Sequence, residues 1–594
     1  MPSNRAARLV FERWTEQLET SYLPRRARTL GTCGALDELT ALADGWVRSG
    51  GLMRPAVDPD DGGHGVAMLP DVGAEAERAI RDDVFLRRRQ PQRRDVLADA
   101  AKRLKGEKPD DTAVRESLAL VRALMKRWRR EYLTGSFDEL ERIVANEPAA
   151  AEDLISLAES VVSELRALGW TDVGLGEAAR HAISERGATP AAISVLRGIV
   201  LREASDFTCF VSLTLPRIRP PFPQDDATFA LVDGLPVGEV VGRAPKRGTQ
   251  VRVTIKAFDV TAAALTAHRR VLSTIGALTV SLPASRIDVA SDVVGVVLPD
   301  GRLRGCEVQE RLVEERRTAK PEEIVSILAS SWRTSATPAA DPLHDAIRLR
   351  HRALVASDAE SRLLLLWSGI ERLTSGARGF RAALGAAKEL VSDAVTFGKL
   401  RRDVGDLAAT IEHAVTHDER RLALHGLIGG FAGGRVDREK VLDHLLGDEP
   451  KLQQLVGLFY DEQPLLAQRC HGLWRDFGGG NPDRRGKSIA DYHKRSQERV
   501  AWQVGRIYRG RNRIAHVGVG PERVRDLVGH AHFYLTQLVA ICVHYAERSE
   551  LRAQEVLSRR MGQYQAFVQL LAKGDPACTT AKVLLRPSTL VGGE

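Results

Sequence analysis

Residue types that can hold phosphate and move protons lie together in the segment 511–516, which reads RNRIAH. Arginine stays charged and can bind two phosphate oxygens at once, and histidine, with an ordinary pKa near ~6.5, exchanges protons near neutral pH. If the segment is helical, Asn512 and His516 share one face because they are four positions apart, and Arg511 lies beside them. RNA carries its own nucleophile, the ribose 2′-hydroxyl, so such a set of groups could cleave it.

These residue types suggest a role for each side chain. We expect Arg511 to stabilise charge on a phosphate, His516 to act as general acid or base, and Asn512 to orient the imidazole or the phosphate. A purely structural interpretation stays open, in which Arg511 pairs with Glu371 and His516 caps a helix end, where the helix dipole favours its cation. Glu371 is expected to be a structural partner of the motif rather than a proton carrier.

The spacing of arginine and histidine does not identify the site by itself. A histidine follows an arginine at the same distance in three places, 420–425, 511–516 and 525–530. Only the second has asparagine directly after the arginine, an apolar helical pattern before it and a turn rich in glycine and proline, 518–521, after it. Context therefore favours the segment 511–516.

This context resembles the HEPN superfamily, in particular the Apea-like HEPN domains of bacterial proteins. The resemblance rests on Trp367 and Glu371 in the segment 365–373, LLWSGIERL, on the RNxxxH pattern at 511–516, and on a closing amphipathic helix from about 522 to beyond 545. It covers roughly 341–550, and the rest of the chain resembles no family that we recognise.

The resemblance implies a metal-independent endoribonuclease whose site is formed by two copies of the chain. We therefore expect a homodimer that acts on RNA and leaves a 2′,3′-cyclic phosphate and a 5′-hydroxyl. Related architectures are bacterial defence effectors and toxins that restrict phage growth, with an N-terminal region that senses or recruits something. Some HEPN domains only bind or dimerise, so a non-catalytic dimerisation or nucleotide-binding module is the alternative.

Other histidines and the cysteines do not form a metal site. His413 and His417 have the spacing of a zinc-binding helix, but Ala414 stands where a metalloprotease has glutamate. The six cysteines are scattered and include no C-x-x-C pair. We expect no metal and no other cofactor, and reduced cysteines of this kind are typical of a cytoplasmic protein. No signal segment or membrane span is expected.

The elements that must position the motif are mostly helical. Apolar spacing and composition predict a mainly α protein with an α+β middle domain and a C-terminal all-helical bundle. The resemblance implies that this bundle is of HEPN type. The predicted parts are a helical segment and loop at 1–75, a helical domain at 76–202, an α+β domain at 203–329, a linker at 330–342, the HEPN-like helical domain at 343–560 and a tail at 561–594.

Local patterns predict several elements within these parts. β-branched runs predict strands at 207–215, 228–232, 249–258, 277–282 and 288–298, and turns at Asp233-Gly234 and Asp300-Gly301. A capping box, Ser357 with Glu360, opens the helix that carries Trp367, and apolar spacing predicts another helix at 400–415.

The charge of the chain permits a polyanionic partner. The formal net charge is +8, and two basic clusters lie at 87–94 and 126–130. Arg127 and Arg129 could bind RNA phosphates beside Trp128 as a stacking surface, as could Arg509 and Arg513 beside the motif. The alternative is that these clusters are solvated helix faces.

Overall fold

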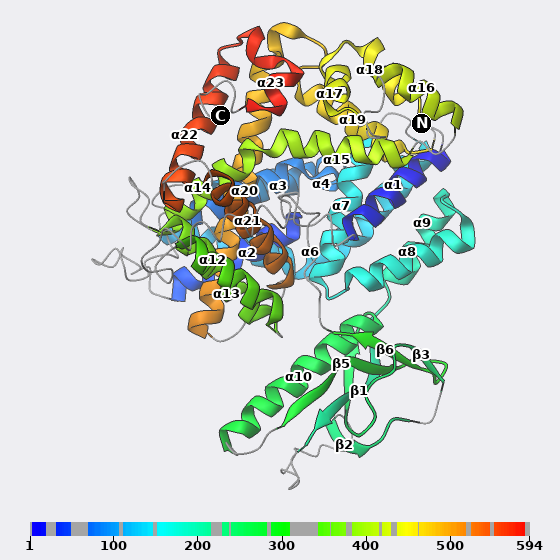
Figure 1. Cartoon of the computed structure of the whole chain (residues 1–594). Coiled ribbons are helices and arrows are strands. Elements are labelled where there is room, and N and C mark those ends of the chain that lie inside the picture. The colour runs from blue at the N-terminus through cyan, green and yellow to red at the C-terminus, as the bar shows by residue number, and fades with distance from the viewer. Residues whose placement is uncertain are drawn as a thin grey trace. The chain divides into compact units, whose positions relative to one another are not determined.

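The computed structural model is mainly helical and contains one small mixed sheet in the middle region, as the sequence predicts (Figure 1). It describes residues 3–18, 31–48, 69–105, 111–146, 151–215, 229–236, 239–281, 287–308, 342–356, 358–375, 383–414, 418–428, 436–460, 462–517, 524–546 and 552–587. The predicted linker up to residue 341 and the glycine-rich turn at 518–521 lie outside these residues, and the last linker position, Pro342, begins a helix.

The chain divides into two compact units. The first is made of Met1–Arg13, Thr20–Ser160 and Val313–Glu594, and the second of Trp14–Glu19 and Val161–Leu312. Two of the boundaries between the units fall inside helices, one in α1 (Ser3–Leu18) and one in α7 (Ala151–Ala167). This division differs from the predicted boundary at 202 because long-range packing, which composition does not report, groups the helices after 161 with the sheet.

The first unit is helical and includes α20 (Pro482–Val517), the helix that carries the motif, and α13 (Ala359–Thr374), the helix that carries Trp367 and Glu371. Its described helices follow in chain order. They are α2 (Thr32–Arg48), α3 (Leu69–Asp82), α4 (Val84–Arg89), α5 (Pro91–Arg103), α6 (Asp111–Asn146), α12 (Pro342–Val355), α13 (Ala359–Thr374), α14 (Ala383–Phe397), α15 (Lys399–Ala414), α16 (Asp418–Ile428), α17 (Arg438–Leu446), α18 (Glu449–Val456), α19 (Pro464–Asp476), α20 (Pro482–Val517), α21 (Val524–Ala546), α22 (Ala553–Ala572) and α23 (Ala581–Leu585).

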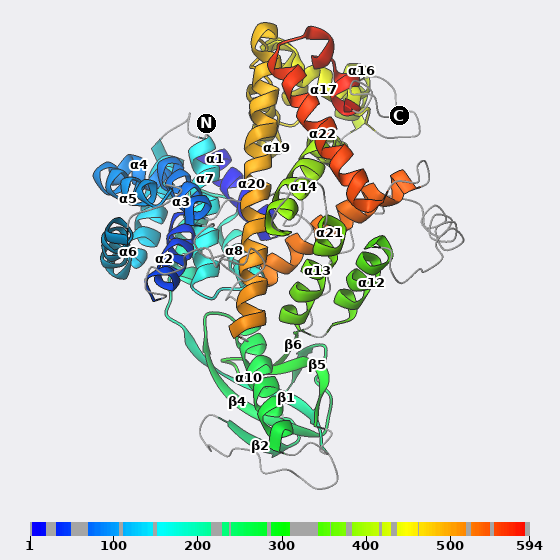
Figure 2. The same cartoon turned by 90° about the vertical axis from the view of Figure 1, so that its left-hand side faces the viewer.

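Within this unit, α20 is the central helix. It packs against α13, α14, α21 and α22, while α13 also packs against α12 and α21. Figure 2 shows α20 running from α22 at one end to α13 and α21 at the other. The 36 residues of α20 span about 54 Å at ~1.5 Å per residue, so one helix positions side chains over a long distance.

Three predicted helices are confirmed, although the start of one differs. The closing helix is α21, and the apolar residues of the 400–415 pattern are buried in α15, among them Leu400, Val404 and Leu407. The helix that carries Trp367, α13, begins after Asp358, whose carboxylate accepts a hydrogen bond from the Ser361 amide at 2.6 Å. The predicted capping residue, Ser357, lies outside the described residues.

The C-terminal segment is part of the core rather than a tail. Tyr564, Phe567 and Leu571 repeat along one face of α22 and are buried, and Leu584 of α23 is buried with them. Phe567 lies 5.7 Å from Phe397 of α14, measured between ring centroids. The predicted end of the helical domain at 560 is therefore too early, because the apolar face of α22 completes a core formed by residues far earlier in the chain.

The second unit is a six-stranded sheet with helices. Its sheet order is β2-β4-β1-β5-β6-β3, and only β3 pairs in parallel, with β6. The strands are β1 (Ser205–Thr214), β2 (Phe229–Asp233), β3 (Val240–Gly242), β4 (Thr249–Ala257), β5 (Asp288–Val297) and β6 (Leu303–Glu307), and the helices are α8 (Asp172–Arg186), α9 (Pro190–Val200) and α10 (Val260–Ser281). The apolar face of α10 packs on the sheet.

Four of the five predicted strands are present, and the fifth is wrong. The run at 277–282 belongs, up to Ser281, to the end of α10. The preference of β-branched residues for strands depends on context, and here the preceding helix continues through them. The turn at Asp300-Gly301 joins β5 to β6, and Gly301 has a φ of 82°, which glycine adopts without a steric penalty. The short strands β3 and β6 were not predicted.

Replacement of Phe567 by alanine tests the assignment of α22 to the core. Phe567 is fully buried, so the lost contacts and the cavity should lower the free energy of unfolding by about 3–5 kcal/mol. The midpoint of urea unfolding, followed by far-UV circular dichroism, measures this change. Leu422→Ala, at a side chain that is 72% exposed, is the control and should change stability by less than about 0.5 kcal/mol. Equal effects of the two variants would contradict the assignment.

Candidate functional site

The predicted motif and its predicted partner helix come together in the first unit. Arg511, near the end of α20, lies with its Nη2 atom 4.0 Å from Oε2 of Glu371 on α13. Its Nη1 atom donates a hydrogen bond to Oδ1 of Asn512 at 2.8 Å. The side chains of Arg511 and Glu371 are 29% and 27% exposed, so solvent reaches the pair. A fixed cation, a carboxylate and an amide therefore meet at one accessible place.

A buried aromatic contact holds the two helices at this place. Trp367 of α13 and Tyr508 of α20 pack with their ring centroids 5.4 Å apart, and both side chains are buried. On the same stretch of α13, a Cβ atom at Gly369 would lie 2.7 Å from a methyl group of Leu535. Glycine thus lets α21 approach α13 closely. The WSGIE pattern therefore has a packing role in addition to supplying Glu371.

Tyr508 belongs to the site, although the sequence did not predict a role for it. Burial raises the pKa of Tyr508 above its ordinary value, while a hydrogen bond with Asn512 acts in the opposite direction. The phenol therefore stays protonated near neutral pH. The signal that would have found it is spacing, because Tyr508, Asn512 and His516 follow each other at intervals of four along one helix face.

His516 lies in the last turn of α20, so the segment 511–516 is helical. Its helical position sets it one turn beyond Asn512 on the same face, about 6 Å along the axis. The side chain of His516 lies outside the described residues, so its role in the site rests on this spacing.

A buried ion pair fixes the opposite side of α20. Arg506, 8% exposed, pairs with Glu75 of α3, which is 3% exposed, and its Nε atom lies 3.4 Å from Glu38 of α2. Burial by itself would lower the pKa of Arg506, but the charges of Glu75 and Glu38 raise it above the ordinary value. Arg506 is therefore charged inside the fold, and α20 cannot rotate without separating it from Glu75.

The cations proposed to bind RNA beside the motif have different surroundings. Arg509 pairs with Glu38 at 2.7 Å and is half-buried, whereas Arg513 is exposed. Of the two candidates on α6, Arg129 lies 3.0 Å from Asp37, and the side chain of Arg127 lies outside the described residues. Among these four, Arg513 is the cation best placed to meet a nucleic-acid backbone near the motif.

Trp128 does not form the predicted stacking surface. Its side chain is 1% exposed, donates a hydrogen bond to Gln90 at 2.9 Å and packs edge-on against Tyr132. A base cannot stack on a buried ring. The prediction failed because a tryptophan among basic residues looks the same in the sequence whether its helix face is turned outward or into the core.

The basic cluster at 87–94 is also largely occupied within the fold. Arg88 lies 2.5 Å from Asp153 and 3.7 Å from Glu139, and Arg89 lies 2.5 Å from Glu139, a side chain that is fully buried. These pairs join α4 to α6 and α7. They favour a structural role for the cluster. The sequence alternative was a solvated helix face, whereas these arginines hold neighbouring helices together.

The other histidines near the motif are core residues. His530 and His532 on α21 are 4% and 3% exposed, and burial, assisted by the charge of Arg350, lowers the pKa of His532 to about 4. Of the proposed zinc pair, His413 is exposed and His417 lies outside the described residues. In the described part of the chain, no group of three or more histidine, cysteine, aspartate or glutamate side chains is arranged to hold a metal ion.

Comparison with models of protein families, with curated proteins and with solved structures gave no match to this chain. One helix of the described residues, Val524–Tyr545 in α21, is long and apolar enough to cross a membrane, but more than half of it is buried inside the fold. A core helix of a soluble protein has the same properties, so this helix is weak evidence for a membrane.

Replacement of Glu75 by alanine tests the anchoring of α20. The variant leaves Arg506 buried with only part of its counter-charge, so the free energy of unfolding should fall by about 3–5 kcal/mol. The double variant Glu75→Leu/Arg506→Met removes both buried charges and should recover most of this loss. Urea unfolding of the two proteins gives the comparison. A double variant that is less stable than Glu75→Ala would contradict a role limited to the ion pair.

Proposed function

We propose that the chain is a metal-independent endoribonuclease whose site lies around Arg511, Asn512 and His516. The observation that carries the proposal is the contact between Arg511 and Glu371, which brings together two motifs 140 positions apart in the chain. The resemblance to HEPN domains rests on these same two segments, and the purely structural interpretation predicts the same contact. The proposal includes a homodimer and a cytoplasmic location, and on the same resemblance a role as a defence or toxin effector.

In the proposed reaction, the ribose 2′-hydroxyl attacks the adjacent phosphorus and the bond from phosphorus to the 5′-oxygen breaks. One proton leaves the 2′-oxygen for a base, and one proton reaches the 5′-oxygen from an acid. The products are a 2′,3′-cyclic phosphate and a 5′-hydroxyl. We assign one of these transfers to His516 and the other to His516 of the partner subunit, because one histidine per chain can supply only one of the two groups.

Arg511 is suited to stabilise the charge on the phosphate. Its contact with Glu371 is long and partly exposed to solvent, and such pairs contribute only about 0–1 kcal/mol. A phosphate that accepts two hydrogen bonds from the guanidinium is a stronger partner, particularly as charge develops in the transition state. Glu371 therefore acts as a positioning residue that orients Arg511 before substrate binds.

Asn512 and Tyr508 complete the proposed site as positioning residues. The amide oxygen of Asn512 accepts a hydrogen bond from Arg511, so the two side chains hold each other on α20. Tyr508 anchors the same face of α20 against Trp367. Neither residue needs to gain or lose a proton. Both restrict the motif to one geometry, which lowers the entropic cost of reaching the transition state.

Cleavage of RNA in the presence of EDTA tests the proposal. Wild-type protein should cut RNA and leave 2′,3′-cyclic phosphate ends, which mass spectrometry identifies. His516→Ala should reduce the cleavage rate by roughly 10²–10⁴-fold, because it removes a general acid or base. Arg511→Lys should also cleave more slowly, since lysine keeps the charge but lacks the two-pronged guanidinium.

The matched control for this experiment is His425→Ala. His425 follows Arg420 at the same spacing as the motif but lies on α16, away from α13, so its loss should leave cleavage unchanged. Arrest of bacterial growth on expression, abolished by His516→Ala, provides a second readout for an enzyme that is inactive until triggered. Unchanged cleavage by His516→Ala, a requirement for added metal, or absence of both cleavage and growth arrest would contradict the proposal.

A further inference from the structure

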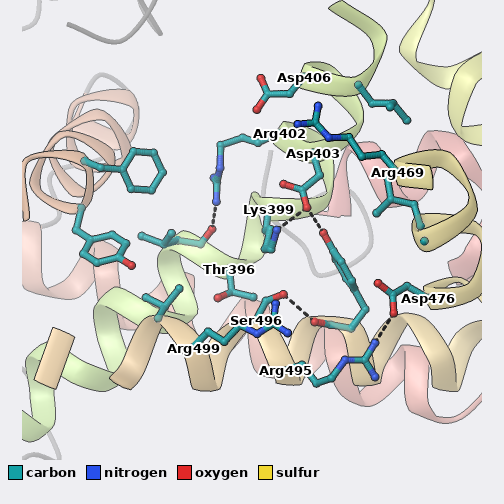
Figure 3. A pocket seen from close by; sticks show the side chains of 18 residues that line it. Thr396, Lys399, Arg402, Asp403, Asp406, Arg469, Asp476, Arg495, Ser496 and Arg499 are labelled. Carbon is teal, nitrogen blue, oxygen red and sulfur yellow. Dashed lines mark hydrogen bonds and ion pairs between the residues drawn. The ribbon is translucent and has the colours of Figure 1, made fainter. Parts of the chain in front are cut away.

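A pocket lined by cations lies in the first unit, at the middle of α20 rather than at its end. Its volume is about 310 Å³, at the small end of the range of about 300–1,000 Å³ that small-molecule sites occupy. Five cations line it from three helices: Lys399 and Arg402 on α15, Arg469 on α19, and Arg495 and Arg499 on α20 (Figure 3). None of these residues belongs to the motif.

The carboxylates in the pocket do not balance these cations. Three aspartates line it, at 403, 406 and 476, so two positive charges remain in excess. Lys399 pairs with Asp403, and Arg495 pairs with Asp476 at 2.6 Å. Arg402 also donates a hydrogen bond to the backbone carbonyl of Val395. The excess of cations over carboxylates gives the pocket a positive potential.

Arg499 is the cation that is most available to a ligand. The residue keeps contact with solvent, and within the described part of the chain it makes no hydrogen bond and no ion pair within 4.0 Å. The protein atoms that surround its guanidinium and the neighbouring charge of Arg78 both lower the pKa of Arg499. Burial and the charge of Arg13 lower the pKa of Arg469 to about 10 in the same way. An anion bound in the pocket would offset the positive charge that surrounds each of these arginines.

The remaining walls of the pocket are apolar and rigid. Leu407, Val500, Phe533 and Tyr534 line it, and all four side chains are buried. Tyr492 also lines the pocket, and its hydroxyl donates a hydrogen bond to the carboxylate of Asp403. A ligand of matching chemistry would have one strongly anionic end and one apolar or aromatic part.

We propose that this pocket binds a phosphorylated small molecule the size of a mononucleotide, with its phosphate held by Arg499 and the neighbouring cations. A phosphomonoester carries a charge of about −1.5 to −2 near neutral pH, which matches the two excess positive charges. Arginines bind phosphate through two parallel hydrogen bonds, and the apolar wall accommodates a base or another flat group. This site is separate from the proposed RNA-cleaving motif and does not depend on it.

Isothermal titration of the full-length protein with adenosine monophosphate, inorganic phosphate and adenosine tests the proposal in the absence of RNA. Adenosine monophosphate should bind with one site per chain. Adenosine and inorganic phosphate should each bind at least tenfold more weakly, because each lacks one of the two recognised parts. Arg499→Gln should weaken binding of adenosine monophosphate at least tenfold, and raised salt should weaken binding to the wild type.

The matched control is Arg484→Gln, which removes the same charge from an exposed position of α20 outside the pocket. It should leave affinity within twofold of wild type. Arg499 is exposed, so its replacement is compatible with folding, and circular dichroism verifies this. The proposal is overturned by absence of saturable binding, by equal binding of adenosine and adenosine monophosphate, or by unchanged affinity of Arg499→Gln. It is also overturned if only 5′-phosphorylated RNA, and not the mononucleotide, binds in a way that depends on Arg499.

Discussion

The buried ion pair between Arg506 and Glu75 determines which way α20 faces. Both side chains are almost fully enclosed, so rotation of the helix would leave an unpaired charge inside the protein, which is strongly unfavourable. Arg509 lies three positions further along and pairs with Glu38 on the same side. Arg511 lies five positions from Arg506, about 140° around the helix, and therefore faces α13 instead. The orientation of α20 that buries Arg506 against Glu75 therefore also directs Arg511 toward Glu371.

The helix α20 carries residues of both the cationic pocket and the proposed RNA-cleaving motif. Arg499 faces the cationic pocket and Arg511 faces Glu371, and these two positions are twelve residues, or about 18 Å, apart on one helix. The buried anchor at Arg506 lies between them on the same helix.

The positive charge of the chain is used in three different ways. The cluster at 87–94 forms ion pairs within the fold, in which Glu139 is fully buried. Arg506 serves as a buried anchor. In a third group, Arg499 in the pocket and Arg513 beside the motif are accessible to solvent. The net charge of +8 is therefore a poor guide to where an anionic partner would bind, because the ion pairs decide which cations remain available.

Local patterns in the sequence determined the mainly helical class, the helices α13, α15 and α21, four of the six strands and the residues of the motif. These features follow from periodicity and turn chemistry, which act between residues close together in the chain. The contact of Arg511 with Glu371 was considered from the sequence as the structural alternative to a catalytic role, and only the fold brought the two segments together. The burial of Trp128, the core position of α22, the role of Tyr508 and the pocket around Arg499 were decided by tertiary structure. In each case the deciding partners lie tens to hundreds of residues away, and composition does not record which face of a helix meets them.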